Sequence, residues 1–180
     1  MSELALSSLE VQQYRTFNRL MIQQFGRVNL IVGRNNVGKS SLLEALWLFT
    51  QRGRPSVLVD LLRSRDEFPR MYRPVDENDV SSKERIWDIR FLFCGRDDLR
   101  DNSKIISIGP VGAPDETLTL TIKWFTLETD EQGTAHRRLI SDPNKRAEGD
   151  PYIVAQVGRN GTRAYRLDRI MERGDRKSVV

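Results

Sequence analysis

The chain has 180 residues, of which 38% are hydrophobic and 30% charged, a size and composition that suit one folded domain with its own core. No apolar run approaches the roughly 18 residues of a membrane span and the N-terminus lacks a signal-peptide pattern, so we expect a soluble cytoplasmic protein. The single cysteine, Cys94, and the single histidine, His136, exclude an internal disulfide, a cysteine metal cluster and a His-rich metal site.

The first elements along the chain are expected to be three strands. Residues 9–14 alternate apolar and polar, which predicts a half-buried strand, and residues 20–25 predict a second one, joined to it through 15–19. Residues 28–32 are almost continuously apolar, which is typical of a central strand covered on both faces. Gly33 ends this third strand.

Helical periodicity begins at Lys39. The apolar residues expected on its inner face, with the last at the edge, are Leu42, Leu43, Leu46, Trp47 and Phe49. Gly53 and Pro55 end this helix in the usual order. Residues 57–65 predict a short second helix, and 66–85, which are charged and contain two prolines, predict a long exposed loop. The second helix is expected to bury Leu58, Leu61 and Leu62.

The remaining sequence predicts an antiparallel sheet. Residues 86–94 and 117–125 alternate, 105–108 predict a short strand, and Asn160-Gly161 predicts a hairpin between strands at 152–157 and 164–167. The turn-rich segment 129–150 is expected to be a surface loop that carries His136. The residues expected on the inner faces of the two alternating strands are Trp87, Ile89, Phe91 and Phe93, and Leu118, Leu120, Ile122 and Trp124.

The segment GRNNVGKS, residues 33–40, has the spacing of a phosphate-binding loop, and the predicted strand before it and helix after it are the context that such a loop needs. Gly33 allows a sharp turn, and Gly38 allows close approach of the backbone to a phosphate. Successive N–H groups from Asn35 through Ser40, including that of Asn36, can surround an anion at the positive end of the helix.

Three side chains of this loop are expected to bind the nucleotide and its metal. Lys39 would contact the β- and γ-phosphates, the Ser40 hydroxyl would bind Mg²⁺, and Ser41 can bond the α-phosphate. A lysine at a helix start is otherwise poorly placed, because the local dipole is already positive. An anionic ligand removes that conflict.

Hydrolysis of the nucleotide also needs a second Mg²⁺-binding carboxylate, which an apolar strand ending in Asp would carry. The segment SVLVD ends at Asp60, but it continues into a predicted helix, and Asp88 lies in the middle of a predicted strand. We therefore assign no catalytic residue within this chain.

The stretch LEVQQYRTFNRLMIQQFGRVNLIVGRNNVGKSSLLEAL, over about residues 7–50, resembles the start of ABC-type ATPases that act on nucleic acid: the RecF, SMC and OLD (overcoming-lysogenization-defect) families. Its NNVGKSSLLEAL part looks most like the OLD-like "AAA" ATPases of prokaryotic defence and repair. The resemblance implies an α/β fold, the N-terminal portion of a P-loop NTPase head: a central strand, the P-loop and its helix at 7–55, a helix and exposed loop at 56–85, and an antiparallel β-lobe at 86–180.

The resemblance also implies site residues and partners. Asn35 matches the asparagine that approaches the γ-phosphate, and Arg15 lies near where such proteins cover the base and ribose. The cofactors would be ATP and Mg²⁺, and two heads would dimerise, each completing the other's site. The Leu-Ser-Ser-Gly-like signature and the strand ending in Asp-Glu are missing, so we expect the N-terminal piece of a longer protein that is an ATPase.

The excess positive charge lies at the end of the chain. Residues 1–150 carry 22 basic and 22 acidic side chains, whereas 151–180 carry 7 and 3. Such a basic segment is a solvated face, a face that pairs with acidic residues of a partner or of a missing segment, or a contact for nucleic acid. For the last, Arg159, Arg163 and Arg166 are the candidates.

Two functions remain open. The first is the ATP-binding half of an OLD/RecF/SMC-like ATPase coupled to nucleic-acid processing or defence. The second is a nucleotide-binding regulatory or assembly module with little turnover, whose partner, for example a nuclease, carries the chemistry. A transporter-type ATPase is disfavoured, because the YRTF hairpin and the long β-lobe fit nucleic-acid heads better.

Overall fold

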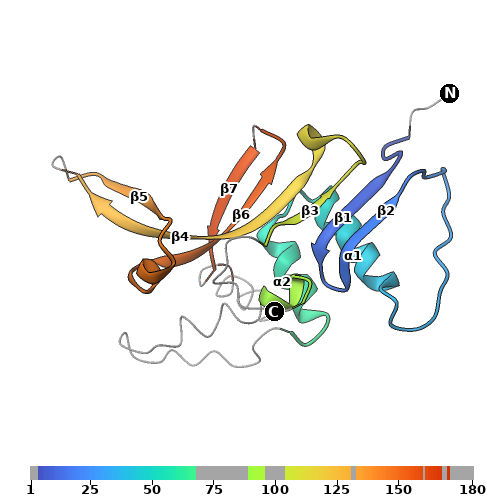
Figure 1. Cartoon of the computed structure of the whole chain (residues 1–180), viewed down its shortest axis with the longest axis horizontal. Coiled ribbons are helices and arrows are strands. Elements are labelled where there is room, and N and C mark those ends of the chain that lie inside the picture. Colours follow the sequence, from blue (N-terminus) through green and yellow to red (C-terminus); the bar gives the residue numbers. More distant parts are fainter. Residues whose placement is uncertain are drawn as a thin grey trace, which may run out of the picture.

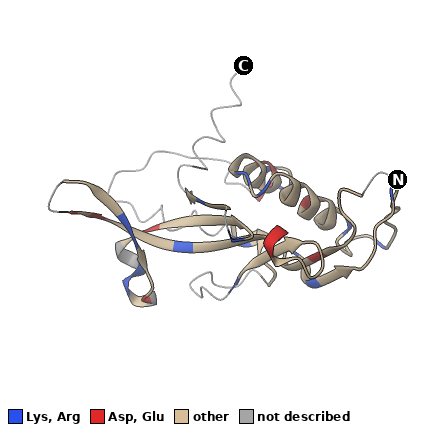
Figure 2. Cartoon of the chain, turned by 90° about the horizontal axis from the view of Figure 1, so that it is seen from above, with Lys and Arg blue, Asp and Glu red and all other residues tan. Residues whose placement is uncertain are grey.

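The computed structural model describes residues 4–67, 89–95, 104–130, 133–159, 161–167 and 170. These residues form a seven-stranded sheet whose main path has the order β2-β1-β3-β4-β6-β7, with β5 also paired to β4. All strand pairings are antiparallel. Two α-helices pack on one face of the sheet (Figures 1 and 2). The fold is therefore mixed α/β, with one continuous sheet that includes the first hairpin as well as the later strands.

The first hairpin consists of β1 (Leu9–Tyr14) and β2 (Phe17–Ile22). The bounds predicted for β1 are confirmed, but β2 begins and ends three residues earlier than expected. Tyr14 pairs with Phe17, so the turn is only two residues long. Its first residue, Arg15, has a φ of 50°, a conformation that makes so tight a turn possible.

The prediction of a buried central strand at residues 28–32 is wrong. This segment leaves the sheet and runs outward between β2 and α1 (Figure 1). Val28, Leu30 and Val32 are 91%, 87% and 77% exposed. A strand exists only where a neighbour takes up its N–H and C=O groups, and no described strand pairs with this segment. Of the two elements expected around the loop at 33–40, the described structure therefore contains the helix after it but not the strand before it.

Helix α1 (Lys39–Thr50) begins where the sequence predicts, but it is rotated relative to the predicted face. Leu42, Ala45 and Leu48 are buried, whereas Leu43 and Trp47 are exposed. The helix is apolar on nearly every side between 42 and 49, so periodicity alone could not select the inner face.

Helix α2 (Pro55–Arg63) confirms the second predicted helix, including the burial of Leu58, Leu61 and Leu62. Gly53 ends the preceding turn with a φ of 64°, and its N–H donates to the carbonyl oxygen of Leu48. Because SVLVD is helical, Asp60 lies on an exposed position of α2 and not at the end of a strand.

Four of the later strands confirm predictions: β3 (Ile106–Gly109), β4 (Leu118–Thr129), β6 (Asp150–Val157) and β7 (Gly161–Arg166). The alternation of β4 is as expected, with Leu118, Leu120, Ile122 and Trp124 buried. β6 and β7 form the predicted hairpin, in which Val157 pairs with Gly161.

Two other predictions in this region are wrong. The described part of 86–94 is not a strand but a short 3-10 helix, η1 (Arg90–Leu92), followed by an isolated bridge between Phe93 and Tyr14. Trp87 and Asp88 lie outside the described residues.

The segment 129–150, expected to be a loop, contains β5 (Ala135–Ile140) and a 3-10 helix, η3 (Pro143–Glu148). β5 pairs with the end of β4 that extends beyond the shorter strands, so His136 belongs to a strand. A further 3-10 helix, η2 (Pro114–Glu116), precedes β4.

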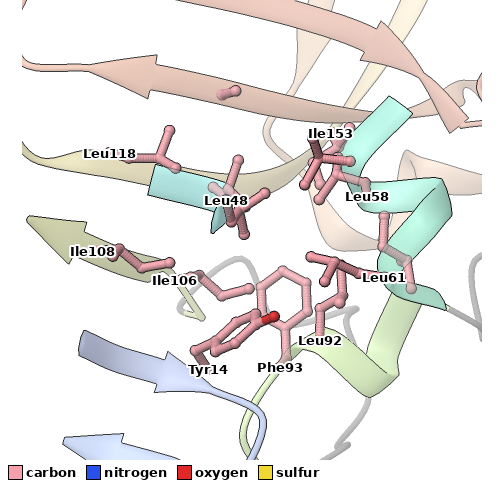
Figure 3. Close-up of a cluster of buried hydrophobic side chains, with 14 of the residues drawn as sticks. Tyr14, Leu48, Leu58, Leu61, Leu92, Phe93, Ile106, Ile108, Leu118 and Ile153 are labelled. Carbon is pink, nitrogen blue, oxygen red and sulfur yellow. The ribbon is translucent and has the colours of Figure 1, made fainter. Parts of the chain in front are cut away.

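The core is a single cluster between the sheet and the helices. Figure 3 shows how side chains from α1, α2, η1 and the strands point toward one another. The labelled members are Tyr14, Leu48, Leu58, Leu61, Leu92, Phe93, Ile106, Ile108, Leu118 and Ile153. In the part of the chain that the structure describes, neither helix has the length and apolarity needed to cross a bilayer.

The orientation of α1 gives a matched pair of variants. Leu48→Ala should lower the free energy of unfolding by about 2–5 kcal/mol, because Leu48 is fully buried and the change leaves a cavity. Leu43→Ala, on the exposed side of the same helix, should change it by less than about 0.5 kcal/mol. Urea denaturation of both variants measures the difference. Equal losses would contradict the observed orientation of the helix.

Candidate functional site

The loop from Gly33 to the start of α1 is shaped by two residues with positive φ. Asn36 has a φ of 62° and Gly38, the residue before the helix, has a φ of 100°. A Cβ atom on Gly38 would lie 2.7 Å from Cζ of Phe17 and 2.8 Å from Oγ1 of Thr16. Gly38 is therefore required by the β1–β2 turn that supports the loop, in addition to any approach to a phosphate.

The helix that leaves this loop has an uncapped N-terminus. Gly38 occupies the N-cap position and has no side chain that could cap the helix. The first turn of α1 holds no acidic residue. Apart from the turn at Asn35 and Asn36, the described backbone N–H groups of residues 35–40 make no backbone hydrogen bond, and the first helical bond is from Leu42 N–H to the carbonyl oxygen of Gly38. Unpaired N–H groups and the positive end of the helix dipole thus lie together at the surface, which is an arrangement that binds anions.

The Lys39 side chain folds back over the loop. Its Nζ atom donates to the carbonyl oxygens of Gly33 and Arg34, at 2.8 and 2.7 Å. An ammonium group has three N–H donors, so one remains for a ligand. The contacts place the positive charge at the first two residues of the loop, and they join the beginning of the loop to its end.

The two serines after Lys39 have different surroundings. Ser40 is exposed, as is Asn35. Ser41 is only 1% exposed, and its hydroxyl oxygen accepts a hydrogen bond of 3.3 Å from Nη2 of Arg65. The Ser40 hydroxyl is thus accessible to a metal ion, whereas Ser41 would have to exchange Arg65 for a phosphate.

Comparison with known proteins shows the family of the chain. A family model described as "AAA ATPase domain" matches residues 5–156, most of the chain. The chain belongs to this AAA ATPase domain family.

Two curated relatives match shorter segments. "Uncharacterized protein MJECL10" of Methanocaldococcus jannaschii is 39% identical over 44 residues, which are 24% of this chain and 20% of that protein. The "ATP/GTP phosphatase" of Helicobacter pylori is 40% identical over 42 residues, which are 23% of this chain and 11% of that protein. The aligned segments therefore span a fifth or less of these relatives' own lengths.

Arg15 lies at the centre of a buried ion-pair network beneath the loop. Its side chain is 4% exposed, with Nε 2.6 Å from Oε2 of Glu44 on α1 and Nη1 2.7 Å from Oε2 of Glu67, after α2. Nη2 donates to the carbonyl oxygen of Leu61 at 3.4 Å. The guanidinium expected to lie near a base and ribose is instead occupied by two carboxylates, and contact with a nucleotide would require it to leave them.

Glu44 connects this network to the loop. Its second oxygen, Oε1, accepts a bond of 2.7 Å from Nε of Arg65, the same arginine that contacts Ser41. The Tyr14 hydroxyl lies 3.4 Å from Oε2 of Glu44, and burial raises the pKa of this hydroxyl above its ordinary value. This network could not be predicted from the sequence beyond the residue types, because its members are far apart along the chain.

The three arginines considered for nucleic acid do not form one stripe. Arg159 is exposed and lies 3.4 Å from Asp115, and Arg163 is exposed on β7. Arg166 pairs with Asp150 at 3.0 Å. Since residues three apart on a strand point to opposite faces, Arg163 and Arg166 lie on different sides of β7.

Among the described residues, no group of three or more His, Cys, Asp or Glu side chains could hold a metal ion.

The buried ion pairs predict a large difference between two arginines. Arg15→Ala should lower the free energy of unfolding by about 3–5 kcal/mol, because it leaves the largely buried Glu67 without its ion-pair partner and Glu44 with Arg65 alone. Arg19→Ala removes an arginine that is 63% exposed and pairs with Glu10, so it should cost less than about 1 kcal/mol. Thermal and urea unfolding test both, and a small effect at Arg15 would contradict the structural role of the network.

The raised pKa of Tyr14 predicts a dependence of stability on alkaline pH. The folded state favours the neutral hydroxyl, so this stabilisation is complete below about pH 10 and is lost as the pH rises further. Between about pH 9 and about pH 11 the free energy of unfolding should fall more steeply for the wild type than for Tyr14→Phe, by up to about 1.4 kcal/mol per pH unit. Parallel curves from urea titrations would show that Tyr14 ionises as readily in the folded protein as in the unfolded one.

Proposed function

We propose that the loop 33–41 binds a nucleoside triphosphate, ATP, with Mg²⁺. The observation that carries this proposal is the uncapped N-terminus of α1, with free backbone N–H groups and the Lys39 ammonium directed to the same place. A triphosphate supplies the negative charge that this arrangement lacks. Membership of the AAA ATPase domain family supports a nucleotide-binding ATPase, and the phosphatase name of the Helicobacter pylori relative fits nucleotide turnover.

The residues present fit the two cofactors. Lys39 would contact the β- and γ-phosphates, and the exposed Ser40 hydroxyl would bind Mg²⁺, which prefers oxygen ligands. Asn35 would approach the γ-phosphate. When bound, Mg²⁺ neutralises charge on the phosphates and so assists their transfer. If the Ser41 hydroxyl bonded a phosphate, it would give up its hydrogen bond from Arg65. Because Arg65 also donates to Glu44, nucleotide binding would then affect the buried ion-pair network.

We further propose that the domain is an ABC-type head of OLD/RecF/SMC kind that acts in pairs and is coupled to nucleic-acid processing or defence. The antiparallel strands that follow the loop and its helix fit such a head. Large apolar side chains next to the loop also support a covered surface in the assembly. They are Val28, Leu30, Val32, Val37, Leu43 and Trp47. Arg159, Arg163 and Arg166 remain candidates for nucleic-acid contact.

A second candidate is a regulatory or assembly module that binds ATP but turns it over slowly. The position of Asp60 favours it, because this carboxylate lies on the exposed side of α2 and cannot serve as the strand-end Mg²⁺ ligand of an ATPase. Measured turnover distinguishes the two functions: a rate at the background level with intact binding supports the module, and sustained hydrolysis supports the enzyme.

Substitution of Lys39 tests the loop. Lys39→Ala should weaken MgATP binding by about tenfold or more, because it removes the charge that the phosphates would contact. Lys145→Ala, an exposed lysine on η3, is the matched control and should bind as the wild type does. Titration with a fluorescent ATP analogue in the presence of Mg²⁺ measures both. Unchanged affinity in Lys39→Ala would rule out the loop as the phosphate site.

A further inference from the structure

A second hollow lies away from the phosphate loop, between α2 and strands β4 to β7. It encloses about 770 Å³, and none of the residues that line it belongs to the loop 33–41. This volume is in the range of sites that hold small organic ligands. Four of its lining residues are arginines, from the residue before α2, from α2, from β5 and from β7: Arg54, Arg63, Arg137 and Arg166.

The cavity has an excess of positive charge. Among the described residues that line it, Asp60 is the one acidic side chain, and Asp150 pairs with Arg166 from outside this lining at 3.0 Å. Within the described structure, no carboxylate forms an ion pair with Arg54 or Arg137. Guanidinium groups that converge on one hollow repel each other, and their planar N–H donors match the oxygens of phosphate. The charge therefore points to an anionic ligand with phosphate oxygens.

The remaining walls of the cavity are aromatic and apolar. The Arg137 guanidinium lies 5.2 Å from the centre of the Tyr152 ring, and that ring packs edge-on against Phe125 at 5.1 Å. Tyr165 is half-buried and also lines the hollow, together with Val59 on α2. Tyr152 is only 5% exposed and its ring lies behind Arg137, so the planar groups that remain for a nucleobase are the Arg137 guanidinium and the Tyr165 ring. Inorganic phosphate would leave the apolar wall without a partner.

We propose that this cavity binds a nucleotide unit, with its phosphate on the arginines and its base against the aromatic wall. The unit comes either from a free nucleotide or from a single strand of nucleic acid, because both present the same phosphate and base. The site is separate from the proposed MgATP site and needs no catalytic step. It adds a binding surface for nucleic acid that the exposed arginines of the β6–β7 hairpin do not account for.

The test compares two double variants in a Lys39→Ala background, in which the phosphate loop is disabled. Arg54→Ala with Arg137→Ala removes two cavity arginines to which the described residues offer no carboxylate partner. Arg52→Ala with Arg138→Ala removes two exposed arginines of neighbouring position that do not line the cavity. Fluorescence anisotropy with a labelled oligothymidylate of about 10 nucleotides measures binding, and thymidine monophosphate serves as the competitor. Circular dichroism confirms that each variant is folded.

The cavity variant should bind the oligonucleotide about tenfold more weakly or worse, with a salt slope shallower by about 2, while the control stays within about twofold of its parent. Competition by thymidine monophosphate identifies a free nucleotide as a ligand, and its failure to compete identifies the strand. Equal losses in both double variants, or no binding of either probe to the Lys39→Ala parent, would overturn the proposal. Because ATP titration of the wild type is measured separately, failure of this site and failure of the phosphate loop are distinguishable.

Discussion

The position of Arg15 is the constraint on which the rest of the structure depends. From the two-residue turn between β1 and β2, its side chain reaches Glu44 on α1 and Glu67 beyond α2, and its backbone N–H donates to the carbonyl oxygen of Leu92. A buried guanidinium is costly to desolvate, so it is tolerated only where carboxylates and carbonyl groups are placed around it. The same residue therefore fixes the first hairpin, both helices and η1 relative to one another, and with them the direction in which α1 meets the loop.

Sequence reasoning succeeded where the information is local. The alternation of β4, the helix after the loop and the Asn-Gly hairpin are each encoded in a few consecutive residues, and each was confirmed. It failed where the presence or absence of a neighbouring strand decides whether a segment forms a strand. Residues 28–32 have the composition of a buried strand but no described neighbour, and Ala135–Ile140 shows no alternation yet forms β5, because the long β4 offers it an unpaired edge.

The candidate site divides in the same way. The glycines, Lys39 and the serines of the loop could be selected as candidates from their spacing in the sequence. In the structure, Lys39 donates hydrogen bonds to two carbonyl groups at the beginning of the loop. The role of Arg15 could not be predicted, because Glu67 is 52 residues away and the turn sequence does not reveal what its side chain will meet. The arginine-lined cavity was equally hidden, since its walls come from α2 and from strands about a hundred residues later.

The outward path of residues 28–32 has a practical consequence. A segment with three exposed β-branched or leucine side chains and free backbone groups is a template for strand addition between molecules. When the chain is concentrated, it should self-associate through this segment. Replacing Leu30 by lysine would therefore improve its behaviour in solution without touching the core, because the side chain faces water.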